Sequence, residues 1–405
     1  MNPTVICTNM SLTTLPSFQT EEDPFARYPS GGGFYAQKFL YFEDNLITEI
    51  PAGAFSALGD LYPGANLTID LSYNQINHID TNALDGLSNN TVSLILRGNQ
   101  LTSLSPALLS AWSLETLDIS YNPLTSIDSN IVQGLAPMLK QFFVSVDHMK
   151  EMPKALSYLQ AVLISVDGIR ETEFEIKLQD NAHTEMLTEL FISNSSLKDL
   201  SGVPCRFPNL RHLHLEENYD LRADMFGKCN SVENLTLNSL GIEKCNLTSV
   251  EISMYRQVRY LRLSENLFEN VPESVLSLSE VWMVDLSYNQ ITSIDDEDFK
   301  GLGILADIIL DGNPLTYISD SAFSTNNLRY LSLRKTLLTT IPTAVMNTQG
   351  LSSLSLPDNA IECSCVAMAH LNGWNMKYSN AHCKDDPDTS VYTYINDNLP
   401  LCTGQ

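Results

Sequence analysis

The 405-residue sequence is short of basic residues and has little charge overall. It carries 23 Lys and Arg against 48 Asp and Glu, a net charge of −25, and charged residues make up only 18%. A nucleic-acid or anionic-membrane surface needs a basic stripe, so this composition argues against both partner classes. Hydrophobic residues reach 43%, which is enough for a large core and argues against wholesale disorder.

Long apolar runs and the motifs of common enzyme classes are also missing. One of the longest largely apolar stretches, Ile304 to Leu310, is far shorter than the roughly 18 residues of a membrane span. There is no Gly-rich phosphate loop, nucleophile elbow or HExxH motif. His212, His214 and Glu216 alternate like a metal-binding trio, but the charged residues beside them indicate a solvated strand. We therefore expect no enzyme activity, no cofactor and no metal site.

The N-terminal segment MNPTVICTNM has no charged region followed by an apolar region, so it does not read as a signal peptide. Two explanations remain open at this point. The protein is intracellular, or the chain begins inside a longer precursor.

A repeat of the form LxLxxNxLxxL runs through the chain. It is clearest at Ile69 to Ile79, Leu117 to Ile127 and Val284 to Ile294. Fixed spacing of this kind is the signature of repeat architectures. With the Asn position as marker we count 14 units, marked by Asn45, Asn74, Asn99, Asn122, Asp147, Asp167, Ser195, Asn218, Leu240, Asn266, Asn289, Asn313, Thr336 and Asn359.

Each unit predicts one short strand followed by a turn. The alternating apolar residues, such as Ile69 and Leu71, give a strand with one buried face. A single unit cannot cover its own apolar residues, whereas stacked units bury a continuous core. The marker Asn lies where the chain turns, and its amide can satisfy backbone groups that have no strand partner.

This pattern resembles the leucine-rich repeat family over about Val5 to Cys402. The resemblance implies an α/β solenoid shaped like a horseshoe, with a parallel concave β-sheet and with short helices, 3-10 turns and loops on the convex side. It divides the chain into residues 1–38, a partial N-terminal cap and irregular loop; 39–361, about 14 leucine-rich repeats; and 362–405, a C-terminal cysteine cap.

The C-terminal cysteines resemble the cap that closes extracellular members of this family. The pairing in that family implies the disulfides Cys363–Cys383 and Cys365–Cys402. A four-cysteine zinc site is the rival interpretation. A further bridge, Cys205–Cys229, and buried free thiols are both open, and Cys7 lacks the partner that the family would supply.

Six N-x-[ST] sequons also favour an extracellular setting. Together with the cysteine cap they predict a secreted protein or a cell-surface ectodomain. The predicted glycosylation sites are Asn9, Asn66, Asn89, Asn194, Asn234 and Asn246.

Residues between the inward leucines project from the predicted concave face and are the candidate ligand-binding residues. The first group is apolar, and exposed apolar patches often mark partner sites. The second group combines arginines and aromatics, which interface hot spots favour. If the irregular middle of the chain is misread by one residue, the apolar group is core instead. The candidates are Phe143, Leu163, Phe191, His214, Arg259, Tyr260, Arg262, Trp282, Arg329 and Tyr330.

The sequence therefore predicts a module that binds a protein or glycan on its concave face or edge. The most favoured setting is the ectodomain of a membrane receptor or a secreted or adhesion protein. Receptors that resemble this pattern continue into a membrane span, so a membrane would be involved only through a segment outside this chain. The alternative is an intracellular leucine-rich repeat scaffold for protein–protein interaction.

Overall fold

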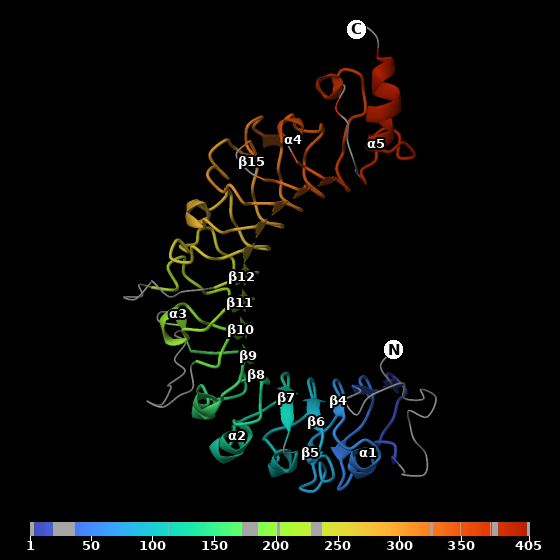
Figure 1. Cartoon of the computed structure of the whole chain (residues 1–405), viewed down its shortest axis with the longest axis vertical. Helices are drawn as coiled ribbons and strands as arrows, with labels where there is room; N and C mark the ends of the chain where they lie inside the picture. The colour runs from blue at the N-terminus through green and yellow to red at the C-terminus, as the bar shows by residue number, and fades with distance from the viewer. Residues whose placement is uncertain are drawn as a thin grey trace. The chain divides into compact units, whose positions relative to one another are not determined.

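The computed structural model describes residues 4–18, 37–111, 113–171, 185–200, 203–227, 237–324, 327–348, 350–372, 374 and 380–402. It forms two compact units, Met1–Ser196 and Leu197–Gln405, here called unit 1 and unit 2. Each unit is built from stacked coils that contribute one strand to a parallel sheet (Figure 1). The structure thus confirms the predicted α/β repeat solenoid, while the cap boundaries at residues 38 and 361 stay predictions.

In unit 1 the strands of the main sheet follow one another in chain order, and a small sheet pairs β3 with β5. The main strands are β1 (Thr4–Ile6), β2 (Lys38–Tyr41), β4 (Asn66–Asp70), β6 (Thr91–Ile95), β7 (Leu114–Ile119), β8 (Gln141–Ser145), β9 (Leu163–Asp167) and β10 (Glu189–Ser193). The small sheet and the helical turns are β3 (Glu49–Ile50), β5 (His78–Ile79), α1 (Ser56–Leu61), η1 (Pro106–Ser110), α2 (Ser129–Leu135) and η2 (Lys154–Tyr158).

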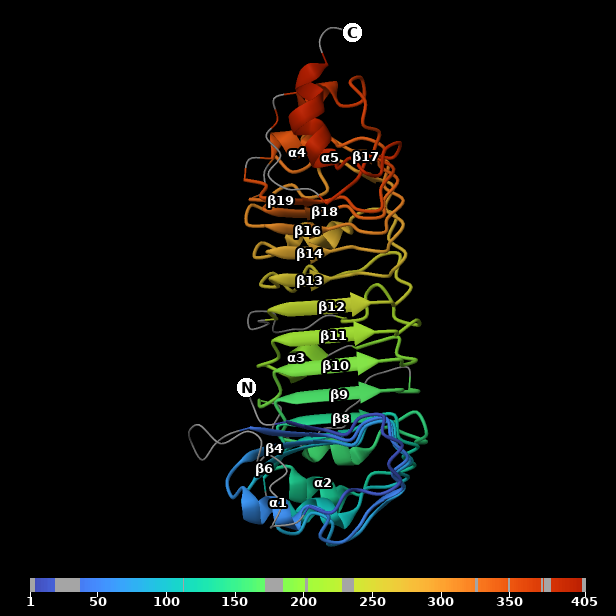
Figure 2. The ribbon, with the colours of Figure 1, turned by 90° about the vertical axis from the view of Figure 1, so that its right-hand side faces the viewer.

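Unit 2 repeats this plan, and its main strands, which are three residues long from β13 onward, lie side by side in Figure 2. Its main strands are β11 (His212–Glu216), β12 (Ser239–Glu243), β13 (Tyr260–Arg262), β14 (Met283–Asp285), β16 (Asp307–Ile309), β18 (Tyr330–Ser332) and β19 (Ser353–Ser355). The small sheet and the helical turns are β15 (Ser293–Ile294), β17 (Tyr317–Ile318), α3 (Val203–Arg206), η4 (Glu273–Ser277), α4 (Ala344–Asn347), η5 (Ala369–Leu371), α5 (Val391–Thr393), η6 (Tyr394–Asn398) and η7 (Leu399–Leu401).

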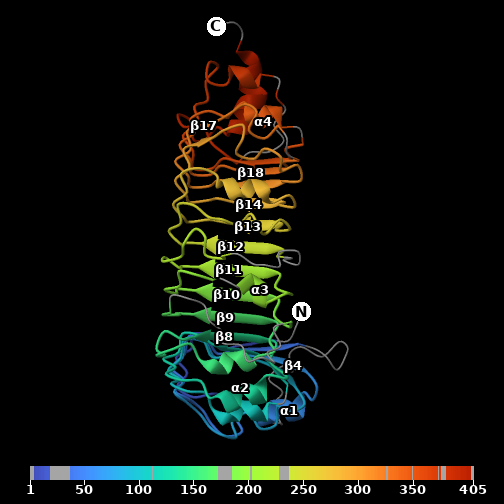
Figure 3. The same cartoon turned by 90° about the vertical axis from the view of Figure 1, so that its left-hand side faces the viewer.

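Strand alternation separates the core from an outward face in every coil. In β4, Leu67 and Ile69 are 1% and 0% exposed, whereas Thr68 and Asp70 lie on the opposite face and are half-buried. The second half of each coil returns over the inward residues, and helices α1 and α2 lie on the side away from the strands of unit 1 (Figures 1 and 3). The outward residues of each sheet therefore form a continuous surface, here called the strand face.

Buried asparagines join successive coils. Asn289 donates from Nδ2 to the carbonyls of Leu286 (3.0 Å) and Ser287 (3.2 Å) in its own coil and of Leu263 (3.0 Å) in the preceding one. Its Oδ1 accepts from the backbone N–H of Phe268 at 3.1 Å. The same pattern recurs at Asn74, Asn99, Asn122, Asn266 and Asn313. This ladder satisfies backbone groups that the turn leaves without strand partners.

Two of the predicted ladder positions are wrong. Strand pairing aligns Val166 with Val144 and Ile192, which places Ile169, not Asp167, three residues later at the ladder position. Pairing of Leu240 with Leu213 and Leu261 makes Leu240 an inward strand residue and moves the ladder position to Cys245. Both errors occur where the ladder residue is not Asn, so the sequence offered no polar marker to align.

Cys245 replaces the ladder amide with a thiol. Its Sγ lies 3.0 Å from the carbonyl of Glu243 and 3.7 Å from that of Leu215 in the preceding coil, the two kinds of acceptor that a ladder Asn contacts. Burial raises the pKa of this thiol to about 12, so it stays protonated and can donate. Cys245 is therefore a structural residue of the coil.

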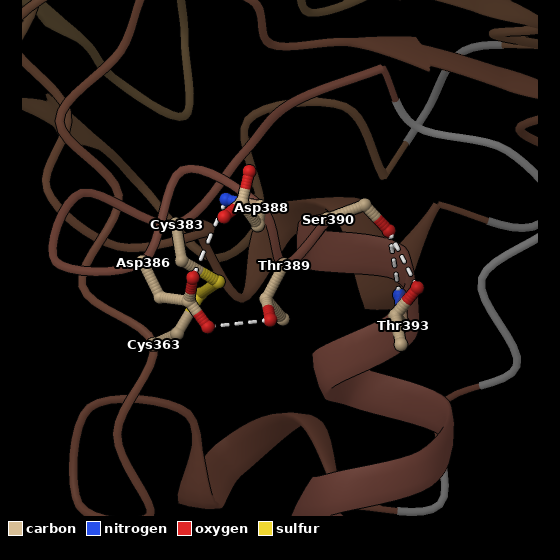
Figure 4. Close-up of a disulfide and its surroundings, with 7 residues drawn as sticks. All are labelled: Cys363, Cys383, Asp386, Asp388, Thr389, Ser390 and Thr393. Carbon is tan, nitrogen blue, oxygen red and sulfur yellow. Dashed lines mark hydrogen bonds between the residues drawn. A yellow bond between two sulfur atoms is a disulfide. The ribbon is translucent and has the colours of Figure 1, made fainter.

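At the C-terminal end, the structure joins Cys363 to Cys383 and Cys365 to Cys402, the same pairs that the resemblance implies. Figure 4 shows the first bridge beside Asp386, whose carboxylate accepts from the Thr389 hydroxyl at 2.6 Å. Met368, Leu371 and Val391 are fully buried in this segment. No helix in the part of the chain that the structure describes is both long and apolar enough to cross a bilayer.

Candidate ligand-binding face

The strand face of unit 2 is ordered in rows, because its parallel strands pair in register. The first row runs through His212, Ser239, Tyr260, Met283, Asp307, Tyr330 and Ser353, and the second through His214, Gly241, Arg262, Asp285, Ile309, Ser332 and Ser355. His214, Tyr260, Arg262 and Tyr330 thus occupy the predicted face. Neighbours within a row lie about 4.8 Å apart, so a ligand on this face meets several coils at once.

Gly241 shapes the centre of the second row. A Cβ at Gly241 would lie 2.6 Å from His214 Nδ1 and 3.1 Å from Glu243 Oε1, so only glycine leaves room for these side chains to lean across the strand. Arg262 donates from Nη1 to Ser239 Oγ at 3.4 Å. Ser264 donates to Glu243 Oε2 at 2.8 Å. The result is a polar cluster of His214, Arg262 and Glu243 around the position of Gly241, which has no side chain.

The electrostatics of this cluster keep His214 neutral. Burial, with the positive charges of Arg262 and His212 as further causes, lowers the pKa of His214 from 6.5 to about 4. Burial raises the pKa of Glu243, although the Ser264 hydrogen bond and Arg262 oppose that change. At neutral pH His214 offers a donor and an acceptor without charge, and Arg262 supplies the positive charge of the row.

Two exposed aromatic side chains lie beside this cluster. Tyr260 and Trp282 are 36% and 38% exposed, and their rings meet edge to face with centroids 5.9 Å apart. Exposed aromatic pairs are costly to leave in water and are favoured as interface anchors. The Tyr260–Trp282 pair is the most prominent apolar feature of the predicted site residues in unit 2.

Arg259, Trp282 and Arg329 lie at the edge where the strands begin, here called the starting edge, one residue before the strand face. The carbonyl of Arg259 accepts both Trp282 N–H (2.9 Å) and Met283 N–H (3.0 Å), and the carbonyl of Arg329 accepts both Ser352 N–H and Ser353 N–H. Both arginine side chains are exposed. The starting edge therefore presents the Arg259 guanidinium group next to the Tyr260–Trp282 pair and that of Arg329 two strands further along.

A hollow of about 370 Å³ opens at this edge between β11 and β14. Glu280 Oε2 lies 3.8 Å from Arg259 Nη2 across it, beyond direct hydrogen-bonding distance. Sequence reasoning missed the hollow because it falls between coils, in segments without a repeat signature. Its lining residues are Arg211, His212, Leu237, Asn238, Gln257, Arg259 and Glu280.

The apolar candidates of unit 1 do not form the predicted row. Strand pairing places Ser165, not Leu163, between Phe143 and Phe191. Leu163 lies two residues before Ser165 on the same face of β9. It pairs with Gln141 and Glu189 and is only 9% exposed. Its assignment as an exposed column residue is therefore wrong. The error has the same cause as the misplaced ladder position at Asp167.

Phe143 and Phe191 remain on the strand face as half-buried residues. Two valines of the neighbouring coils belong to the core, since Val146 and Val166 are 4% and 0% exposed. Among the described residues of this region, unit 1 therefore offers two aromatic rings separated by Ser165 and no continuous apolar patch.

Unit 1 carries a second arginine–aromatic arrangement that the sequence did not indicate. Arg97 donates from Nε to the Tyr73 hydroxyl at 3.1 Å and lies over the Tyr121 ring at 4.3 Å. Burial raises the pKa of the neighbouring Asp118, while Arg97 lowers it. The guanidinium is already held by two aromatic side chains of adjacent coils. The repeated SYN tripeptide was the available signal, since Tyr73 and Tyr121 each precede a ladder Asn.

Five of the six predicted glycosylation sites lie in described residues, and all five asparagines are exposed: Asn9, Asn66, Asn89, Asn194 and Asn246. Asn234 lies outside the described residues, as does Cys229, and the side chain of Cys205 is likewise outside them. Among the cysteines that the structure describes, Cys7 and Cys245 are free thiols. Within the described part of the chain, no three His, Cys, Asp or Glu residues are placed to hold a metal ion.

Comparisons with known proteins agree with this architecture. Sequence profiles of the family described as Leucine rich repeat match residues 256–315, 304–361 and 113–135. Chaoptin of Drosophila melanogaster is 28% identical over 160 residues, which cover 34% of this chain and 12% of that protein. Podocan of Mus musculus is 26% identical over 206 residues, which cover 49% of this chain and 31% of that protein. The chain thus spans less than a third of either relative.

Among solved structures, a leucine-rich repeat protein of Leptospira interrogans superposes with a TM-score of 0.51 at 20% identity, covering 91% of this chain and 92% of that one. A likeness at this identity concerns the fold alone. The stacked parallel strands, the asparagine ladder, the C-terminal disulfides and the matched profiles lead to one conclusion. The chain is a leucine-rich repeat protein with disulfide-bonded cysteines at its C-terminal end.

Proposed function

We propose that this chain is a ligand-recognition module that binds an acidic protein or glycan with the strand face and starting edge of unit 2. One observation carries the proposal: the exposed Tyr260–Trp282 pair adjoins the exposed Arg259, and the exposed Arg329 lies two strands further along the same edge. Arginine and aromatic residues dominate binding hot spots. Solenoids of this kind commonly use the strand face for binding.

Charge supports the same choice of ligand. The chain has a net charge of −25, so an acidic ligand is repelled by most of its surface. Exposed arginines at the starting edge reverse this locally, and complementary charge steers association. Leucine-rich repeat proteins are typically non-catalytic binding proteins, and we propose the same of this chain.

We propose an extracellular setting, as the ectodomain of a membrane receptor or a secreted or adhesion protein. Two disulfides and five exposed sequon asparagines support it, because disulfides persist in oxidising compartments. Mass spectrometry of the native protein with and without reductant tests this setting. Bridged cap cysteines and sugar on the sequons are expected. Thiols that are all reduced would favour the alternative, an intracellular scaffold.

The binding role is tested on an array of purified cell-surface proteins and glycans. Tyr260→Ala combined with Trp282→Ala should abolish binding to the array partners that the unmodified chain captures. Tyr317→Ala is the matched control, because Tyr317 is 55% exposed but lies in the small sheet β15–β17, outside the strand face. Equal capture by the double variant and the control would refute the proposed face.

A further inference from the structure

The hollow at the starting edge is a polar site in a size range that holds small ligands. At about 370 Å³ it falls within the roughly 300–1,000 Å³ of typical ligand pockets. Such pockets are usually lined mostly by apolar groups, whereas Leu237 is the one aliphatic side chain among the described residues that line this hollow. Its natural occupant is therefore rich in hydrogen-bonding groups.

The lining side chains can both donate and accept. Asn238 and Gln257 carry amides that do both, Glu280 accepts, and the guanidinium of Arg259 only donates. A ligand hydroxyl also donates and accepts, so several neighbouring hydroxyls would be matched by this set. This combination is the chemistry of a sugar ring.

The charge of the hollow selects an anionic sugar. Among the described residues that line the hollow, Arg211 and Arg259 carry guanidinium groups and Glu280 carries the one carboxylate. Glu280 stays 3.8 Å from Arg259 Nη2, so the pair is a loose ion pair and Arg259 keeps donors for a ligand. Arginine binds carboxylate and sulfate groups with paired hydrogen bonds.

An extended peptide is a poorer fit, because the backbone at this edge is already occupied. The carbonyl of Arg211 accepts the N–H groups of Asn238 and Ser239, and the carbonyl of Asn238 accepts those of Arg259 and Tyr260. Peptides added to a sheet gain affinity from main-chain hydrogen bonds. Recognition at the hollow must instead use side chains, with Trp282 next to Arg259 as the apolar contact for a ring.

We propose that the hollow lined by Arg211, Asn238, Gln257, Arg259 and Glu280 binds an anionic saccharide, a sugar residue that bears a carboxylate or sulfate. This inference rests on the proposed function and names its ligand class. Binding combines hydroxyl contacts to the amides, an anion contact to Arg259 and ring contact with Trp282.

Three tetrasaccharide probes distinguish the sources of charge: a chitin fragment without charge, a heparosan fragment with carboxylates only, and a heparin fragment with carboxylates and sulfates. Titration calorimetry should show at least one anionic probe binding tenfold tighter than the chitin fragment. Preference for heparosan over chitin identifies the carboxylate as sufficient, and binding of heparin alone identifies the sulfate. Equal binding of the neutral probe, or no binding of any probe, would overturn the inference.

Variants locate the site. Arg259→Gln should weaken binding of the anionic probe at least tenfold, and Gln257→Ala should weaken this binding severalfold. Glu280→Gln should tighten it, because the competing carboxylate is gone. Arg334→Gln is the matched control, since Arg334 Nη2 lies 3.8 Å from Asp358 Oδ2 in a comparable exposed pair elsewhere on unit 2. Melting temperatures should not change in any of the four.

Equal weakening by Arg259→Gln and Arg334→Gln would mean general charge attraction and would overturn the site. This outcome is distinct from failure of the proposed function. A different outcome is that no saccharide binds, but the Tyr260→Ala, Trp282→Ala variant still loses binding to the array partners. The strand face is then the binding surface and the proposed saccharide class is wrong.

Discussion

The last three coils of unit 1 stack as the Asn-bearing coils of unit 2 do, but without a ladder asparagine. In unit 2, Asn266, Asn289 and Asn313 each bond to two coils. In unit 1, the coils marked by Asp147, Ile169 and Ser195 lack this amide, yet their strands stay paired and their apolar residues stay buried. Strand pairing and burial therefore suffice to stack a coil, and a ladder asparagine makes the stacked coil more stable.

The two strand faces also differ in what their arginines can do. Arg97 in unit 1 is held by Tyr73 and Tyr121. Arg259 in unit 2 forms a loose pair with Glu280 at 3.8 Å. A guanidinium already engaged by neighbours offers less to a ligand than one facing an open hollow. This difference supports the proposal that unit 2 carries the binding surface, although both units carry exposed aromatics.

The largest expected effect concerns the end of unit 2. Cys365→Ser combined with Cys402→Ser removes a bridge that spans 37 residues, which is worth about 3–4 kcal/mol on the chain-entropy model. Guanidinium unfolding should show this loss. Cys7→Ser, at a free thiol of unit 1, should change the unfolding midpoint little, and equal effects would show that the bridge does not stabilise the end of the solenoid.

The ladder comparison gives the next effect. Asn289→Ala leaves several buried backbone groups unsatisfied and should cost about 1–3 kcal/mol. Ser195→Ala removes a single hydroxyl, which accepts from Ile169 N–H at 3.0 Å and donates to the Ser193 carbonyl at 2.7 Å, so its cost should be smaller, about 1 kcal/mol. Both are measured by denaturant midpoints. A cost for Ser195→Ala as large as that for Asn289→Ala would remove the distinction between the two ladders.

Acid should destabilise unit 2 through His214. Its pKa is lowered from 6.5 to about 4 by burial, Arg262 and His212, so the unfolded chain takes up this proton first. The stabilising contribution of neutral His214 is complete above pH 6.5 and is lost as the pH falls towards 4. Glu243, whose pKa is raised, acts in the opposite direction.

The difference between the unmodified chain and His214→Gln isolates the histidine. Thermal melts from pH 7 to pH 4 should show a smaller loss of stability for His214→Gln. Parallel curves for the two proteins would show that the pKa of His214 is the same in the folded and the unfolded chain, and would contradict the prediction.

The smallest effect concerns Cys245. An amide donates and accepts more strongly than a thiol, so Cys245→Asn should extend the ladder and raise stability by about 0.5–1 kcal/mol. Cys245→Ala, which removes the donor, should lower it by a similar amount. Destabilisation by Cys245→Asn would indicate that the coil is packed around sulfur and cannot accept the larger group.

The sequence sufficed for the repeat, the inward leucines and the coils with Asn, because strand alternation and a polar marker occur at fixed spacing there. The predicted register was wrong where the ladder residue is Ile169 or Cys245, because the sequence offers no polar marker there to fix the position of the strand. Leu163 was misplaced for this reason. Residues of one coil, such as Tyr260 and Arg262, could be assigned to the face, whereas the hollow with Glu280 arises only when neighbouring coils stack.

Hydroxyl-radical footprinting tests the difference between the two faces most directly. Trp282 and Tyr260 of unit 2 and Tyr73 and Tyr121 of unit 1 are all at least 36% exposed, so each is oxidised in the unbound chain. With the tightest-binding anionic tetrasaccharide added, oxidation of Trp282 and Tyr260 should fall at least threefold while Tyr73 and Tyr121 stay unchanged. Protection of Tyr73 and Tyr121 with continued oxidation of Trp282 would contradict the account.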